Sequence, residues 1–261
     1  MSLVHIVTIP GIGSKKKGYS EKFKEDILKF SKRTALDGKI KIHEALPFNV
    51  TNIDDRQRLL FERLNKENKL GGMLSLRKFV LEAFGDGVTF ERGAFKENSP
   101  YRKIHKYLKS FFENIYKEMD SNSKLVIVAS SLGAHILSTY VWDADNDIGI
   151  FQNEKANKEN DLSNLSYLAT IGANIPLFIS GYKEEEIKPI NVEKRKNNFK
   201  WHNFYDKDDV LGWPLKQLSS EYSKVVEDFQ INTGLYVGSH IRYWSDNDFT
   251  KPFTRYLVKS F

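Results

Sequence analysis

Cysteine is absent from the 261-residue chain, and this absence excludes three kinds of structure or chemistry. Without thiols the chain has no disulfide scaffold, no thiolate zinc site and no cysteine nucleophile. Long apolar runs are missing as well, because none approaches the roughly 18 residues that a membrane span requires. The amino-terminal stretch lacks the basic region and the small-residue cleavage site of a signal peptide, so we expect a cytoplasmic protein.

Charge of one sign is only slightly in excess. The 40 Lys and Arg residues exceed the 34 Asp and Glu residues to give a net charge of +6, and the two signs are interleaved along the chain. Nucleic-acid binding requires a concentrated basic stripe. The densest basic patches are Lys15–Lys17 and Lys194–Lys196 with Lys200, and we interpret the second as solvated surface. The composition therefore predicts no nucleic-acid partner.

The sequence does contain enough apolar material for a folded core. Hydrophobic residues make up 40% and aromatic residues 13%, which excludes the disordered class. Strand-like and helix-like segments alternate without internal repeats. This order is typical of an α/β fold with a mostly parallel sheet and helices on both faces. We expect a single domain over residues 1–261.

Short apolar runs bounded by turn residues predict the strands of this sheet. They are Val4–Ile9, Lys39–Glu44, Leu125–Ala129, Leu165–Ile171, Phe199–Tyr205 and Val225–Ile231. Helical spacing predicts helices over about 20–33, from Pro100, after Gly133 and over Asp248–Phe261. The run Leu125–Ala129 shows no alternation, so we place it at the centre of the sheet.

Two segments interrupt this alternation. Residues 50–99 contain two short helical patterns, around Leu59–Leu64 and Leu76–Phe84, separated by glycines. We expect a helical insertion that could cap a pocket, with apolar residues that line an acyl tunnel or, for most of them, pack on the core. Residues 143–164 are polar and rich in Asn and Asp, which predicts a mobile surface loop.

The junction after Leu125–Ala129 carries the most informative motif. Its sequence, ASSLG at 129–133, places a Ser between a strand and a helix, as in the nucleophile elbow whose usual form is G-x-S-x-G. Ser131 is in register because Ala129 and Gly133 supply the small residues on either side. Ser130 is out of register because Leu132 would take the second small position. The alternative is an ordinary turn in which Ser131 caps the helix.

An elbow Ser requires a base later in the chain. After the helix that follows the elbow, the chain contains two histidines. His202 lies within a predicted strand, whereas His240 follows the last predicted strand, where a loop can reach over the sheet edge to Ser131. We therefore predict that His240 is the base.

The acid that orients this base should follow the preceding strand. Three carboxylates are present there, in the sequence DKDD at 206–209. We select Asp209 because it lies deepest in the turn and precedes an apolar step. Asp206, at the end of the strand, is the alternative acid, and Asp208 is expected to face solvent.

An oxyanion hole requires two backbone N–H donors. The N–H of Leu132 follows the nucleophile, and the loop after the first strand supplies a second donor, for which we select Ile12. Gly11 and Gly13 let this loop approach a substrate closely. The loop does not match dinucleotide or P-loop fingerprints. Lys15–Lys17 could attract an anionic substrate, although a solvated loop tip is favoured.

Local patterns for metal binding are missing. His5, His43, His105 and His202 belong to no HxH, HExxH or Asp-rich pattern. We interpret His5 and His43, which alternate within predicted strands, as structural. We expect neither a metal nor an organic cofactor.

These motifs together resemble the α/β-hydrolase superfamily, in particular lipase- and esterase-like serine hydrolases of a poorly characterised bacterial branch. The resemblance rests on PGIG at 10–13, SSLGA at 130–134, TIGANIPLF at 170–178, NFYDKDDVLGWPL at 203–215 and SHIRYW at 239–244. Pro10 stands where such relatives have His, and Ala129-Ser130 replaces the Gly-His of their GHSLG elbow.

The resemblance implies an α/β-hydrolase fold, an acyl substrate, no cofactor and, by position, a triad of Ser131, Asp209 and His240. We expect the chain to cleave a small-molecule or lipid-like ester through an acyl-enzyme. An acyltransferase or thioesterase with the same triad is one alternative. A catalytically silent binding protein is another, and the altered positions above motivate it. Tyr243 and Trp244 either wall the substrate site or belong to the core.

Overall fold

The computed structural model of this chain contains one sheet of six parallel strands. The structure describes residues 3–11, 16–51, 53–69, 96–234 and 237–261 and the single positions 74, 78, 81, 85, 87 and 90. The strand order is β2-β1-β3-β4-β5-β6. The strands are β1 (Val4–Ile9), β2 (Ile40–Glu44), β3 (Lys124–Ser130), β4 (Leu165–Ile171), β5 (Lys200–Asp206) and β6 (Val226–Ile231). All six predicted strands and the expected α/β fold class are confirmed.

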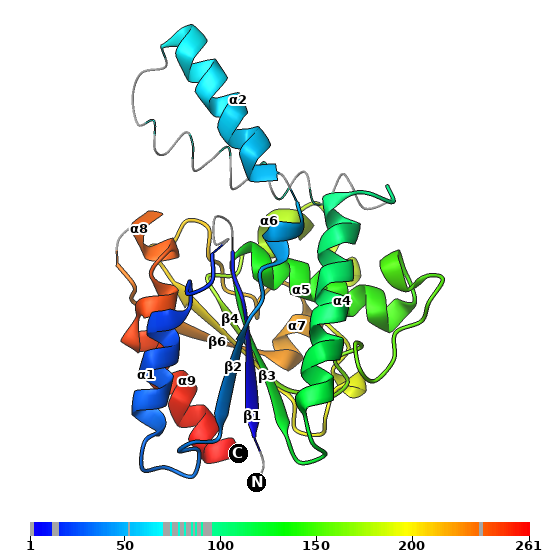
Figure 1. Ribbon diagram of the computed structural model, residues 1–261, viewed down its shortest axis with the longest axis vertical. Helices are drawn as coiled ribbons and strands as arrows, with labels where there is room; N and C mark the ends of the chain where they lie inside the picture. The colour runs from blue at the N-terminus through cyan, green and yellow to red at the C-terminus, as the bar shows by residue number, and fades with distance from the viewer. Residues whose placement is uncertain are drawn as a thin grey trace.

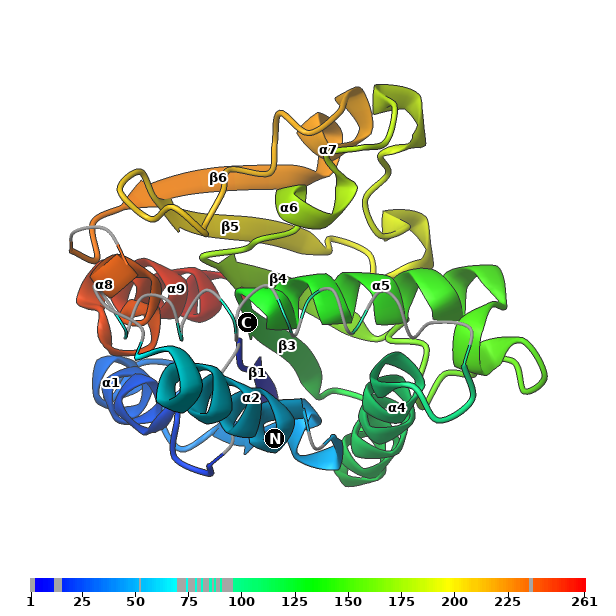
Figure 2. The same ribbon diagram turned by 90° about the horizontal axis from the view of Figure 1, so that it is seen from above.

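Helices cover both faces of the sheet (Figures 1 and 2). One face carries α1 (Glu21–Ser31) and α9 (Asn247–Ser260), and the other carries α4 (Pro100–Glu118) and α5 (Leu132–Asn146). Shorter helices lie in the connections: α6 (Pro176–Ile179), α7 (Ser220–Val225), α8 (Val237–His240), η1 (Pro47–Val50), η2 (Gly149–Phe151), η3 (Glu184–Glu186), η4 (Val192–Lys194) and η5 (Tyr243–Ser245).

The two faces have separate hydrophobic cores. On the α1 and α9 face, Phe23, Phe249, Phe253 and Leu257 pack with no exposed area. On the other face, α4 buries one stripe of its apolar side chains. Between the cores lies β3, whose side chains from Leu125 to Ser130 are all buried, as expected for a central strand.

The prediction of a surface loop over 143–164 is wrong for its first residues and for several buried positions, whereas residues 152–155 are exposed as predicted. Residues 143–146 continue α5, and Phe151 is completely buried. Asn160 is also buried; its carbonyl accepts a 2.7 Å hydrogen bond from Tyr140, and its amide donates to Glu113 at 2.8 Å. The side chain of Asn160 therefore has a partner inside the fold rather than in solvent.

Part of the basic patch at Lys194–Lys196 also faces inward rather than into solvent. Arg195 is 6% exposed and forms an ion pair with Asp145. Its guanidinium also donates to the carbonyl of Asp161. The patch therefore fixes the segment after α5 in place, and Arg195 is not part of a solvated basic surface.

Within the expected insertion, the structure describes one long helix, α2 (Ile53–Asn68), which extends beyond the carboxyl ends of the strands (Figure 1). Leu59 and Leu64 on this helix are 57% and 42% exposed, so these two do not pack on the core as we favoured for most of the apolar residues. The second predicted helix, around Leu76–Phe84, lies mainly outside the described residues. Of the helices that the structure describes, none has the length and hydropathy to cross a bilayer.

The burial of Phe151 gives a direct test of the corrected segment. Phe151→Ala should lower the free energy of unfolding by about 3–5 kcal/mol, because it leaves a cavity in the core. Ile148→Ala, three residues earlier at a position that is 43% exposed, should change it by less than about 0.5 kcal/mol. Urea unfolding measures both, and equal effects would contradict the burial of this segment.

Candidate active site

The turn between β3 and α5 holds Ser131 in a strained conformation. Its φ of 51° and ψ of −126° lie outside the regions that L-residues favour. The Ser131 N–H donates to the carbonyl of Ile171 at 3.0 Å, which ties the turn to the end of β4. This strand–turn–helix geometry is the one that the elbow motif predicts.

Glycines at two positions allow the backbone to pack tightly around Ser131. A Cβ atom on Gly133 would lie 2.4 Å from the carbonyl oxygen of Pro10, and one on Gly11 would lie 2.6 Å from the Cβ of Ser131. Neither position can hold a larger side chain without a backbone shift. The small residues of the motif are therefore required by the contact between the β1 loop and the start of α5.

His240 joins Ser131 to Asp209 through two hydrogen bonds. Its Nε2 lies 2.7 Å from the Ser131 Oγ, across 109 residues of chain, and its Nδ1 lies 2.8 Å from Oδ2 of Asp209. A carboxylate only accepts, so we assign the ring proton to Nδ1, which leaves Nε2 free to accept from the Ser131 hydroxyl. The structure thus brings together all three residues selected from the sequence.

The Asp209 carboxylate is fully buried and surrounded by donors. Besides His240, it accepts from the N–H of Leu211 at 3.0 Å and from the hydroxyl of Tyr243 at 3.0 Å. Gly172 and Gly212 pack directly against it, and a Cβ on Gly212 would lie 2.3 Å from Oδ2. This packing excludes water from the carboxylate and fixes its orientation.

Tyr243 has a role that the sequence did not reveal. It is completely buried, and its hydroxyl accepts from the N–H of Asp206 at 2.9 Å while donating to Asp209. Burial and the adjacent Asp209 carboxylate raise the pKa of Tyr243 far above its usual range, so the phenol remains a donor. Trp244 packs edge-on against Tyr19 and Phe23 in the core, which is the second of the two roles considered for it.

The alternative acid, Asp206, contacts a different set of groups. Its Oδ2 accepts from the N–H of Thr233 at 2.6 Å, and the Thr233 hydroxyl also lies 3.0 Å from both this oxygen and the carbonyl of Ser239. Burial alone would raise the pKa of Asp206, but these bonds and the N–H of Asp208 outweigh it and lower the pKa. Asp206 therefore anchors the segment that carries His240 to the end of β5.

Of the two N–H donors predicted for the oxyanion hole, the structure describes one, that of Leu132. Leu132 is the first residue of α5, and the first N–H groups of a helix have no carbonyl partner within it. Gly11 lies against Ser131, whereas Ile12 and Gly13 lie outside the described residues. The predicted donor of Ile12 therefore stays a prediction.

A groove of about 350 Å³, lined by both apolar and polar side chains, opens beside α5. Its apolar lining consists mainly of Ile175, Phe178, Ile179, Tyr182 and Tyr222. His135, four residues after Ser131, stacks on Phe178 with ring centroids 4.1 Å apart. The groove therefore begins about one helical turn from Ser131, and its volume lies within the usual range for small-molecule sites.

No protein-family model matches the sequence, and no curated protein matches it either. Among solved structures, the chain is similar to a proposed hydrolase of the alpha/beta superfamily from Xanthomonas campestris pv. campestris, with 12% identity, a TM-score of 0.43, and coverage of 96% of this chain and 98% of that one. The esterase domain of a Rhodothermus marinus protein is 10% identical, with a TM-score of 0.43 and coverage of 99% of this chain and 88% of that one. A thioesterase from the prodiginine pathway of Streptomyces coelicolor is 8% identical, with a TM-score of 0.40 and coverage of 100% of this chain and 87% of that one.

The close approach at Gly133 predicts a specific sensitivity. Gly133→Ala should lower the free energy of unfolding by about 1–3 kcal/mol, because the new methyl group meets backbone carbonyl oxygens that cannot rotate away. Gly181→Ala is the matched control, since nothing lies within 4 Å of a Cβ there. Thermal and urea unfolding measure the difference, and a neutral Gly133→Ala would contradict the geometry described for the turn.

Proposed function

We propose that the chain is a serine hydrolase that cleaves carboxylic esters through an acyl-enzyme. The observation that carries the proposal is the continuous chain of hydrogen bonds from the Ser131 hydroxyl through the His240 ring to the buried Asp209 carboxylate. A hydroxyl is a weak nucleophile until a base removes its proton, and this arrangement supplies such a base.

The proposed reaction has two halves. In the first, the Ser131 Oγ attacks the ester carbonyl carbon while Nε2 of His240 takes the hydroxyl proton, and Asp209 stabilises the imidazolium. The N–H of Leu132, with a second donor from the loop after β1, holds the negative oxygen. The tetrahedral intermediate then expels the alcohol, which takes the proton from Nε2.

In the second half, water replaces the alcohol. His240 removes a proton from the water as the oxygen attacks the acyl carbon, and the bond to the Ser131 Oγ then breaks. The Oγ takes the proton back from Nε2, and the free acid leaves. Every proton that His240 accepts is returned, so the reaction requires no cofactor.

The distance between base and nucleophile distinguishes the proposal from its main alternative. A silent binding protein does not need the Ser131 Oγ and the His240 ring within hydrogen-bond reach, and the 2.7 Å separation favours the enzyme. Transfer of the acyl group to an alcohol, or cleavage of a thioester, would use the same residues. Product analysis with and without an acceptor alcohol distinguishes these reactions.

We place the acyl part of the substrate in the groove beside α5. His135, one helical turn after Ser131, lines the groove together with aromatic and aliphatic side chains, and Glu186 and Lys188 line it as well. An apolar acyl chain would bury its surface against the aromatic and aliphatic side chains. This proposal favours esters with an apolar acyl group over short, polar ones.

A fluorophosphonate probe tests the nucleophile. The folded wild-type chain should be labelled on Ser131, as identified by mass spectrometry of the peptide, and should hydrolyse a panel of esters of varied acyl length. Ser131→Ala should lose the label and at least about 10⁴-fold of the turnover. Ser130→Ala, at the preceding buried Ser, should retain both. An unlabelled wild type, or equal labelling of Ser131→Ala, would contradict the proposal.

Tyr243 should act as a positioning residue for Asp209. Tyr243→Phe removes a hydrogen bond to a buried charge, so we expect kcat to fall about 10- to 100-fold. KM should stay nearly constant, because Tyr243 is completely buried and does not reach a substrate. Steady-state kinetics and urea unfolding measured together give the answer. A loss of stability with an unchanged kcat would mean that the hydroxyl serves the fold alone.

A further inference from the structure

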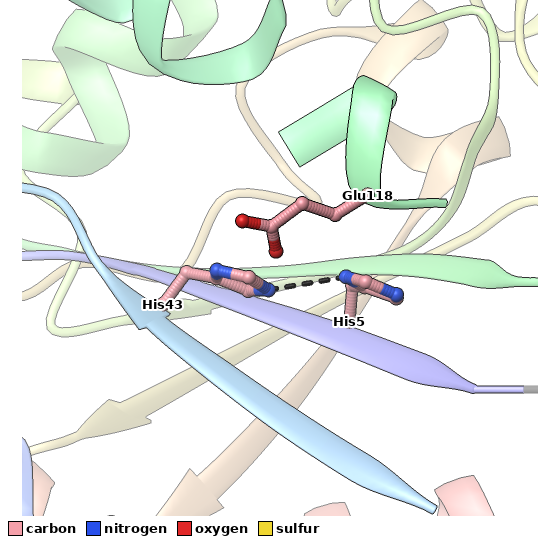
Figure 3. Close-up of side chains that lie close together, drawn as sticks. All are labelled: His5, His43 and Glu118. Carbon is pink, nitrogen blue, oxygen red and sulfur yellow. Dashed lines mark hydrogen bonds between the residues drawn. The ribbon is translucent and has the colours of Figure 1, made fainter. Parts of the chain in front are cut away.

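Two histidines and a glutamate meet on the face of the sheet that α4 covers. In the parallel pairing of β1 and β2, His5 lies opposite Lys41 and Val7 lies opposite His43. Because side chains alternate along a strand, His5, Lys41 and His43 point to the same face. Glu118, the last residue of α4, lies over them, and Figure 3 shows its carboxylate beside the two imidazole rings.

The spacing of these groups fits a shared ion. His5 Nδ1 and His43 Nε2 form a hydrogen bond of 3.1 Å, and one ligand atom from each of the three residues lies within 4.8 Å of the others. Two nitrogens bound to the same tetrahedral zinc ion are about 3.3 Å apart, given Zn–N bonds of about 2.0–2.1 Å. The nitrogen pair therefore already has close to the separation that a common metal requires.

In the hydrogen bond between the two rings, one ring carries its proton on the shared side. A metal ion bound between the rings would require that ring to carry its proton on its other nitrogen. His5 Nδ1 is paired with His43, whereas the other ring nitrogen, Nε2, has no hydrogen-bond partner in the part of the chain that the structure describes.

Lys41 is the competitor for this site. Its ammonium lies 2.6 Å from Oε2 of Glu118, so it is the cation that the carboxylate now faces. The side chains of Lys41 and Glu118 are both about half exposed, at 51% and 47%. Either can therefore rotate, and a divalent ion can replace the ammonium.

We propose that His5, His43 and Glu118 bind one divalent transition-metal ion of the Zn²⁺ type, with solvent completing the coordination. Two imidazoles and a carboxylate without a thiolate suit Zn²⁺, Ni²⁺ or Cu²⁺ better than Ca²⁺ or Mg²⁺. In the sheet register His5 lies beside Leu125, roughly 20 Å before Ser131 along the strands. The ion therefore links β1, β2 and α4 and takes no part in ester cleavage.

Titration of the chelator-stripped full chain with Zn²⁺ against a chromophoric chelator tests the site. We expect one equivalent bound with a Kd on the order of micromolar, together with a rise in Tm. His43→Gln and Glu118→Gln should each weaken binding at least about tenfold. Lys41→Gln should tighten it severalfold, because the competing cation is gone.

Matched variants make the result specific. Glu221→Gln removes an exposed glutamate that is paired with Lys224 at the same 2.6 Å, and it should leave binding unchanged. The substituted positions are exposed or half-buried, and circular dichroism checks their folding. Ester turnover of His43→Gln without zinc should equal that of the wild type, so the outcome is independent of the proposed hydrolysis. Absence of saturable binding, or binding that neither His43→Gln nor Glu118→Gln weakens, would overturn the site.

Discussion

A negative charge buried without solvent contact, the Asp209 carboxylate, is the constraint on which the candidate active site depends. A buried carboxylate is costly unless donors surround it. Here one donor comes from its own turn, through Leu211, and two come from the segment after β6, through His240 and Tyr243. Stabilising the charge therefore brings that segment to the end of β5. The same contacts place the imidazole beside Ser131.

The two carboxylates at the end of β5, Asp206 and Asp209, contact different parts of the segment that carries His240. Asp206 accepts the N–H of Thr233 and so anchors the chain before His240, whereas Asp209 contacts the ring itself. Tyr243 connects the two, because its hydroxyl bonds to the backbone of one and the side chain of the other. Asp206 thus does not contact the His240 ring itself but holds Thr233 and Tyr243 in place beside it.

Much of the fold and the core of the site could be predicted, because their signals are local. The strands are continuous apolar runs, and Ser131 lies in a five-residue motif whose steric demands at Gly133 are met in the structure. The order of chain segments then left His240 as the base. The choice between Asp206 and Asp209 was closer, since they lie three residues apart in the same turn and both are buried.

The errors arose where a partner lies far away in the sequence. The polarity of 143–164 suggested exposure, but Asn160 bonds to Glu113, 47 residues earlier, and the Asp145 carboxylate faces Arg195. The contact between His5 and His43, which are 38 residues apart, also arises only because β1 and β2 are neighbours. The polarity of a side chain can be read from the sequence, whereas its burial depends on partners from distant parts of the chain.

The parallel sheet also makes the candidate site depend on contacts that are distant in the sequence. Neighbouring parallel strands cannot be joined by a tight hairpin, so each pairing waits for a crossover to collapse onto a face. Contacts of such long range form slowly. The contact between Ser131 and His240 joins the end of β3 to the chain beyond β6, which is held to the sheet by the pairing of β6 with β5. The candidate site is therefore complete only when the last strand and the chain beyond it are in place.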